Sequence, residues 1–312
     1  MRSVCVRMLL ASVLLVPGVV AARAAESSPF TRTQDVVYGR KFGTALTMDV
    51  VTPKKDANGA AIIFAVSGGW FSAHEAIDGI SKVFLPELLK RGYTVFAVVH
   101  GSQPKFTIPE ILEDMHRAVR YIRYHARDYH IDPDRIGITG ASAGGHLSLM
   151  QGTAGKEGDP NAKDPVDRVS SRVQAVACFF PPTDFLNYGE KGKDAIGRGT
   201  LAGFKAPFAF HEQDPKTGTF QPVTDEKKIR EIGRQISPLY HVSADDPPTL
   251  IIHGDADKLV PIQQAESIIA KLKEVGVPAK LVVKKDAVHG WPGMEKDMVT
   301  IADWFDKYLQ KK

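Results

Sequence analysis

Residues 136–150 read Ile-Gly-Ile-Thr-Gly-Ala-Ser-Ala-Gly-Gly-His-Leu-Ser-Leu-Met. The first four have the apolar, β-branched character of a short buried strand, and the residues from Ala143 onward are typical of a helix. Between them, residues 140–144 match the pattern Gly-x-Ser-x-Gly. Glycine tolerates the backbone angles and the close approach of a sharp turn. The stretch therefore predicts a strand–turn–helix unit, with Ser142 at the turn and beside helix N–H groups that favour negative charge.

Short apolar runs alternate with helical patterns on both sides of this unit. The strand-like runs lie at residues 60–66, 94–99, 173–180, 249–253 and 279–283. The helical patterns lie at residues 84–91, 109–129, 261–275 and 295–309. Such alternation predicts an α/β fold: a mostly parallel central sheet with helices on both faces. Residues 35–38 and 46–51 have the pattern of an antiparallel β-edge.

One region interrupts this rhythm. Residues 187–235 are rich in Gly, Lys and Phe and have weak periodicity. A long irregular insert in a compact domain is typical of a lid or rim at a functional site, and the alternative is a plain surface loop. We expect residues 25–312 to form one domain that carries residues 187–235 as this insert.

Residues 1–24 have the pattern of a secretory signal peptide. A basic start precedes a largely apolar run at 8–20, and Ala22 and Ala24 place small residues where a signal peptidase cleaves. The alternative is an uncleaved anchor, but the apolar run is shorter than the roughly 20 residues that a spanning helix needs. We therefore expect cleavage after Ala24, a secreted or periplasmic protein, and no membrane span in the mature chain.

Composition and charge exclude several classes of protein. The 312 residues are 43% hydrophobic and 24% charged, which excludes a disordered, collagen-like or coiled-coil chain. Residues 1–24 hold three arginines and no acid, so their removal lowers the formal charge from +4 to +1 and gives no support for nucleic-acid binding. Cys178 is then the only cysteine, which excludes an internal disulfide. Its apolar surroundings predict a buried strand position rather than a nucleophile.

A serine hydroxyl near neutral pH needs a base, and the base needs an orienting acid. His289 lies in Ala-Val-His-Gly-Trp, just past the last predicted strand, and Asp257 follows the strand before it. Asp255 is a rival acid two residues earlier. We expect His253 and His146 to be structural.

These residues resemble the α/β-hydrolases of the esterase/lipase and prolyl-oligopeptidase-like group, and most closely the small secreted acetyl-xylan and feruloyl esterases. The resemblance covers nearly the whole mature chain. It implies an α/β-hydrolase fold in which Ser142 is the nucleophile, His289 the base and then the acid, and Asp257 the orienting partner. It favours Asp257 over Asp255, because the acid of the family lies in Asp-x-x-Val-Pro, as residues 257–261 read here.

The oxyanion hole is expected from the loop after residues 60–66. Related esterases carry His-Gly-Gly-Gly there, whereas residues 66–69 of this chain read Val-Ser-Gly-Gly. The resemblance implies that the backbone amides of Gly68, Gly69 and Ala143 stabilise the oxyanion. Trp70 and Phe71 follow the loop and are candidate substrate contacts, with core packing as the alternative.

The sequence thus predicts an exported serine hydrolase that cleaves acetyl or feruloyl esters of carbohydrates. The alternatives are a peptidase of the prolyl-oligopeptidase type and an inactive hydrolase-fold binding module. The large propeller that usually precedes the hydrolase domain of such peptidases does not fit in the residues before Ser142. The sequence holds no metal-binding or nucleotide-binding motif, so we expect no cofactor, and it does not indicate an oligomeric state.

Overall fold

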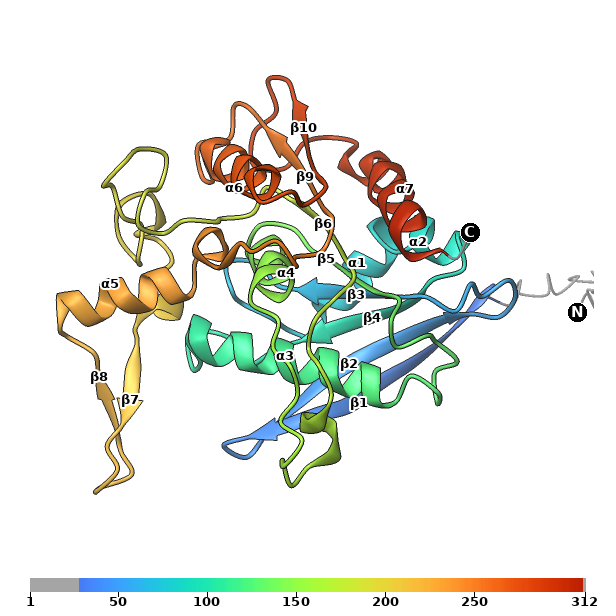
Figure 1. The fold of residues 1–312 in the computed structure, drawn as a ribbon, viewed down its shortest axis with the longest axis horizontal. Helices are drawn as coiled ribbons and strands as arrows, with labels where there is room; N and C mark the ends of the chain where they lie inside the picture. The colour runs from blue at the N-terminus through green and yellow to red at the C-terminus, as the bar shows by residue number, and fades with distance from the viewer. Residues whose placement is uncertain (1–27, 311–312) are drawn as a thin grey trace, which may run out of the picture.

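A twisted sheet of eight strands forms the centre of the computed structural model, which describes residues 28–310 (Figure 1). Its strand order is β1-β2-β4-β3-β5-β6-β9-β10. All neighbours from β4 to β10 are parallel, whereas β2 runs antiparallel to both β4 and β1. The strands are β1 Phe30–Lys41, β2 Thr44–Pro53, β3 Ala61–Val66, β4 Thr94–Val99, β5 Ile136–Thr139, β6 Ala175–Phe179, β9 Thr249–Gly254 and β10 Ala279–Lys284. The predicted sheet and its antiparallel edge are confirmed.

Helices cover both faces of the sheet. One buried cluster joins the sheet to α3 (Ile108–Tyr124), α4 (Ala143–Thr153) and α6 (Gln263–Glu274). A second cluster on the opposite face joins it to α1 (Ala76–Val83), α2 (Pro86–Lys90) and α7 (Met298–Leu309). Short 3-10 helices lie at Pro165–Arg168, Gly199–Leu201, Ala206–Phe208, Pro238–His241 and Met294–Asp297.

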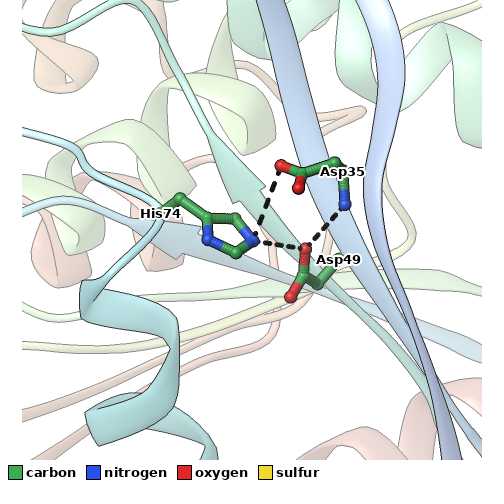
Figure 2. Close-up of side chains that lie close together, drawn as sticks. All are labelled: Asp35, Asp49 and His74. Atoms are coloured by element: carbon green, nitrogen blue, oxygen red, sulfur yellow. Dashed lines mark hydrogen bonds and ion pairs between the residues drawn. The ribbon is translucent and has the colours of Figure 1, made fainter.

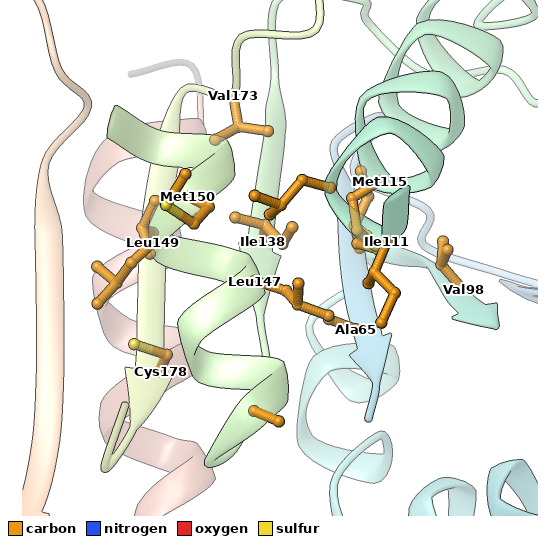
Figure 3. Close-up of a cluster of buried hydrophobic side chains, with 14 of the residues drawn as sticks. Ala65, Val98, Ile111, Met115, Ile138, Leu147, Leu149, Met150, Val173 and Cys178 are labelled. Carbon is orange, nitrogen blue, oxygen red and sulfur yellow. The ribbon is translucent and has the colours of Figure 1, made fainter. Parts of the chain in front are cut away.

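Helix α4 runs through the interior and is buried on every side. Its residues from Ala143 to Gly152 are all buried, which agrees with a sequence that is not amphipathic. Figure 3 shows Leu147 of α4 between Ile138 of β5 and the α3 side chains. Cys178 is buried in β6, and burial raises the pKa of its thiol well above the ordinary value. This burial confirms the predicted strand position.

Two helices differ from the predicted patterns. The expected helix over residues 109–129 ends at Tyr124 and begins with a capping box in which Thr107 and Glu110 bond each other's backbone. Helix α1 was not predicted, because Gly79 and its polar neighbours weaken the helical signal. Its packing against the sheet outweighs this low propensity, since Ile77 is fully buried.

The insert over residues 187–235 has more regular structure than its sequence indicates. It contains a hairpin of β7 (His211–Gln213) and β8 (Phe220–Pro222), followed by α5 (Glu226–Gln235). The hairpin projects from the body of the molecule, at the lower left of Figure 1. Aromatic side chains at Phe208 and Phe210 are buried and attach the insert to the core.

The predicted signal peptide lies outside the described residues. Between residues 28 and 310, no helix combines the length and apolarity that a bilayer crossing requires.

Candidate active site

Ser142 occupies the sharp turn between β5 and α4. Its backbone angles are φ 55° and ψ −117°, a conformation that costs a non-glycine residue about 1–3 kcal/mol. A Cβ atom on Gly140 would lie 2.5 Å from the carbonyl of Gly144, and one on Gly144 would lie 2.6 Å from the Ala65 oxygen. Neither glycine can therefore carry a side chain, and the turn has the predicted form.

The structure brings His289 and Asp257 to this serine. His289 Nε2 lies 2.9 Å from Ser142 Oγ, and His289 Nδ1 lies 2.7 Å from Asp257 Oδ2. Asp257 follows β9 and His289 follows β10, so both reach the edge where the parallel strands end. Phe180 supports the imidazole, with ring centroids 4.5 Å apart. In this geometry Nδ1–H donates a hydrogen bond to the carboxylate, and Nε2 accepts a hydrogen bond from the serine hydroxyl.

Asp257 is a buried carboxylate with a full set of donors. Its Oδ1 accepts the amides of Leu259 and Val260, each at 2.9 Å. Burial alone raises its pKa, but hydrogen bonds from His253 and His289 outweigh burial and hold the pKa well below its ordinary value. Asp255, the rival acid, instead accepts the Asp286 amide at 2.6 Å. The structure thus places Asp257, and not Asp255, against His289.

His146 lies one helical turn after Ser142 and faces the interior. Its Nδ1 accepts the indole N–H of Trp70 at 3.2 Å, and its Nε2 donates to the carbonyl of Ile236 at 2.7 Å. Burial lowers its pKa to about 4, so the ring is neutral. His253 is equally buried and donates to Val260 O. Neither ring is placed to serve Ser142 as a base.

The loop after β3 is a tight turn that differs from the expected donor set. Gly68 and Phe71 exchange two backbone hydrogen bonds of 2.9 Å, and Gly69 and Trp70 have φ values of 56° and 61°, as in a type I′ turn. The Gly68 amide is therefore engaged by Phe71 and is not free to bind an oxyanion. Within residues 28–310, the amides of Gly69, Trp70 and Ala143 have no hydrogen-bond partner. The free Trp70 amide lies outside the predicted donor set of Gly68, Gly69 and Ala143.

Trp70 and Phe71 have opposite surroundings. Trp70 is 2% exposed and packs against Phe185 together with Phe204 and Phe208 of the insert. This burial does not fit the expected role of Trp70 as a substrate contact, because its indole belongs to the core. Phe71 is 53% exposed and remains available to a ligand.

A buried histidine that the sequence analysis did not single out is hydrogen-bonded to Ser67, directly before the turn at residues 68–71. His100 follows β4 and donates from Nδ1 to Gly101 O at 2.8 Å, so its Nε2 accepts the Ser67 hydroxyl at 2.9 Å. Burial lowers its pKa to about 4. The imidazole comes from the end of β4, which neighbours β3, and the position of His100 just after a predicted strand was the available signal.

One group of described side chains has the spacing of metal ligands, namely Asp35, Asp49 and His74 (Figure 2). His74 Nε2 lies 3.0 Å from Asp49 Oδ1, which also accepts the Asp35 amide. The second oxygen of Asp49 pairs with Arg32 at 2.6 Å. Both oxygens are thus occupied by protein donors, and the cluster ties the segment after the turn to the β1–β2 edge.

Comparisons with known proteins identify the family of the chain. The BD-FAE family model matches residues 48–272. The chain is 31% identical over 244 residues to the probable carboxylic ester hydrolase LipM of Mycobacterium tuberculosis, covering 77% of this chain and 52% of LipM. It thus spans about half the length of the curated relatives it matches.

Solved structures are similar over nearly the whole chain. A truncated carbohydrate esterase from gut microbiota has a TM-score of 0.73 at 28% identity, covering 92% of this chain and 99% of that one. An acetyl ester-xyloside bifunctional hydrolase from Caldicellulosiruptor lactoaceticus has a TM-score of 0.70 at 23% identity, covering 88% of this chain and 96% of that one, and shows the fold alone. Because the family model matches residues 48–272, more than half of the chain, the chain belongs to the BD-FAE family of α/β-hydrolase esterases.

Proposed function

We propose that this protein is a serine esterase that cleaves carboxylic esters through an acyl-enzyme. One observation carries the proposal: a continuous hydrogen-bonded chain runs from Ser142 Oγ through both nitrogens of His289 to Asp257. Family membership supports the same chemistry. An inactive binding module is the less favoured interpretation, because a purely structural site has no need of this alignment.

The reaction follows from the positions of the donors and acceptors. Ser142 Oγ attacks the ester carbonyl while His289 Nε2 takes its proton, and Asp257 stabilises the imidazolium that results. When the tetrahedral intermediate collapses, His289 returns the proton to the leaving alcohol. Water then attacks the acyl-enzyme by the same base catalysis and regenerates the serine.

The developing oxyanion needs fixed N–H donors. Ala143 supplies one from the start of α4, and the turn after β3 supplies Gly69 and Trp70. Loss of one such donor typically costs about 10²- to 10³-fold in rate. We infer that Gly68 contributes by shaping the turn rather than by donating.

The proposed substrates are acetyl or feruloyl esters of carbohydrates. The support is the family and the 28% identity to a carbohydrate esterase over 92% of the chain. A secreted or periplasmic location, proposed from the pattern of residues 1–24, would give access to polysaccharides outside the cell.

Labelling and kinetics of a single variant test the function. Ser142→Ala should lower the hydrolysis of p-nitrophenyl acetate by about 10⁴-fold or more and abolish labelling by a fluorophosphonate. Ser267→Ala, a matched change in α6, should leave both unchanged. A prolyl-anilide assayed in parallel tests the peptidase alternative. Full esterase activity in Ser142→Ala, or anilide cleavage without ester cleavage, would contradict the proposal.

A further inference from the structure

A pocket of about 320 Å³ lies beside the Ser142 turn and has no role in the chemistry above. Its walls come from the end of β3, the turn after it and α1, and they include Phe64, Gly68, Phe71, Ile80, Phe84 and Ala141. Ser67 contributes the one side-chain hydroxyl of the wall, and that hydroxyl is bonded to His100. The pocket therefore offers an apolar surface with no free side-chain donor.

The strand order fixes where this pocket lies relative to the proposed acid–base. Ser142 follows β5; β3 lies on one side of β5, and β9 and β10 lie on the other beyond β6 (Figure 1). The pocket belongs to the β3 side, and His289 belongs to the β10 side. Ala141 of its wall directly precedes Ser142, and Gly68 directly precedes the free Gly69 amide. The pocket wall thus includes the residue directly before Ser142 and the first residue of the turn after β3, although Ser142 and Gly69 themselves do not line it.

This arrangement separates the two halves of a bound ester. His289 has to reach the leaving oxygen in order to protonate it, so the alcohol lies on the β10 side of Ser142. The carbonyl oxygen points to the Gly69 and Ala143 amides. The remaining substituent of the carbonyl carbon is the acyl chain, which is left to face the β3 side, where the pocket lies.

The size of the pocket sets the class of acyl group. A water molecule takes about 30 Å³ of liquid volume, so the pocket has room for about ten groups of that size. An acetyl group would leave most of it unfilled. We propose that the pocket is the acyl-binding subsite, and that the enzyme favours apolar acyl groups of about eight carbons, aromatic or aliphatic, over acetyl. This inference rests on the proposed esterase function.

Pocket-filling variants test the inference. Ala76 and Ile80 of α1 line the pocket, and Ala76 is exposed, so Ala76→Trp can narrow the pocket without disturbing the core. We expect Ala76→Trp to lower the ratio of kcat/KM for p-nitrophenyl octanoate to that for p-nitrophenyl acetate at least tenfold, with acetate changed less than twofold. Val83→Trp, on α1 but outside the pocket wall, is the matched control.

Each outcome separates the subsite from the esterase itself. An unchanged octanoate-to-acetate ratio in Ala76→Trp, with normal acetate hydrolysis, would overturn the acyl subsite and leave the esterase proposal intact. A wild-type enzyme that cleaves acetate but neither octanoate nor methyl cinnamate would also overturn it. Absence of any ester cleavage, together with no fluorophosphonate label on Ser142, would instead reject the esterase on which the inference rests. If Ala76→Trp does not fold, Ala73→Trp in the same wall takes its place, and an unchanged octanoate-to-acetate ratio in that variant overturns the subsite.

Discussion

Acidification should destabilise this protein through two histidines that take no part in the proposed reaction. His100 and His146 are buried as neutral rings, and each uses one nitrogen as a hydrogen-bond acceptor. Burial lowers the pKa of each to about 4 from an ordinary value of 6.5. As the pH falls below 6.5, these histidines therefore become protonated in the unfolded chain while they stay neutral in the folded chain.

The size of the effect follows from these pKa values. A difference of one pKa unit corresponds to about 1.4 kcal/mol, so each histidine contributes on the order of 3 kcal/mol of stability at neutral pH. That contribution is fully present above pH 6.5 and is lost progressively between pH 6.5 and pH 4. Many domains have total stabilities of only about 5–15 kcal/mol, so the loss should be large enough to measure.

Urea unfolding followed by tryptophan fluorescence measures this loss. We expect the free energy of unfolding to fall steadily as the pH is lowered from about 7 to about 4.5. His146→Gln should flatten this dependence by about one proton, because glutamine does not titrate. His130→Asn, at an exposed position whose positive φ asparagine tolerates, should leave it unchanged. Equal stability at pH 6.5 and pH 4.5, or the wild-type slope in His146→Gln, would refute the reasoning.

Three further predictions concern the site and the core. Asp257→Asn should lower kcat for ester hydrolysis by about 10³- to 10⁴-fold, whereas Asp255→Asn should change kcat only a few-fold. Similar losses in both variants would remove the basis for choosing Asp257 as the orienting acid. Gly140→Ala should prevent folding or lower the melting temperature sharply, because the new Cβ would lie 2.5 Å from the Gly144 carbonyl. Gly79→Ala in α1 places its Cβ in open space, so it should raise the free energy of unfolding in urea by about 0.5–1 kcal/mol. Cys178 should react with a thiol reagent only after denaturation, and rapid modification of the native protein would contradict its burial.

The sequence predicts most of the fold because local and long-range signals agree there. The apolar runs that become β3, β4, β5, β6 and β9 are buried on both faces, and such strands read as continuous hydrophobic stretches. The turn at Ser142 is predictable for a related reason. Only glycine fits at positions 140 and 144, so the two glycines in the sequence indicate a tight turn of the backbone.

The turn after β3 could not be predicted in detail, since its hydrogen bonds depend on neighbours that are distant in the chain. The sequence Gly68-Gly69 suggests that both backbone amides are free to bind a ligand. In the structure the Gly68 amide donates to the Phe71 carbonyl and is not free. Likewise an aromatic residue next to a site suggests a ligand contact. Trp70 is buried instead because the insert, more than 130 residues later, brings Phe204 and Phe208 against it.

The turn at residues 68–71, which carries two of the proposed oxyanion donors, is therefore positioned by the insert as well as by β3. Trp70 belongs to this turn, His146 belongs to α4 and Ile236 directly follows α5, and two hydrogen bonds join the three in series. A Cβ on Gly69 would also lie 2.5 Å from the Phe204 ring, so the insert packs directly on the turn. Each of these bonds is between uncharged buried groups, and breaking one leaves a donor and an acceptor that water cannot easily reach, at about 1–3 kcal/mol for each unpaired group. We therefore expect a displaced insert to disturb the packing of Trp70 and Gly69 together, and with it the two amides proposed as oxyanion donors.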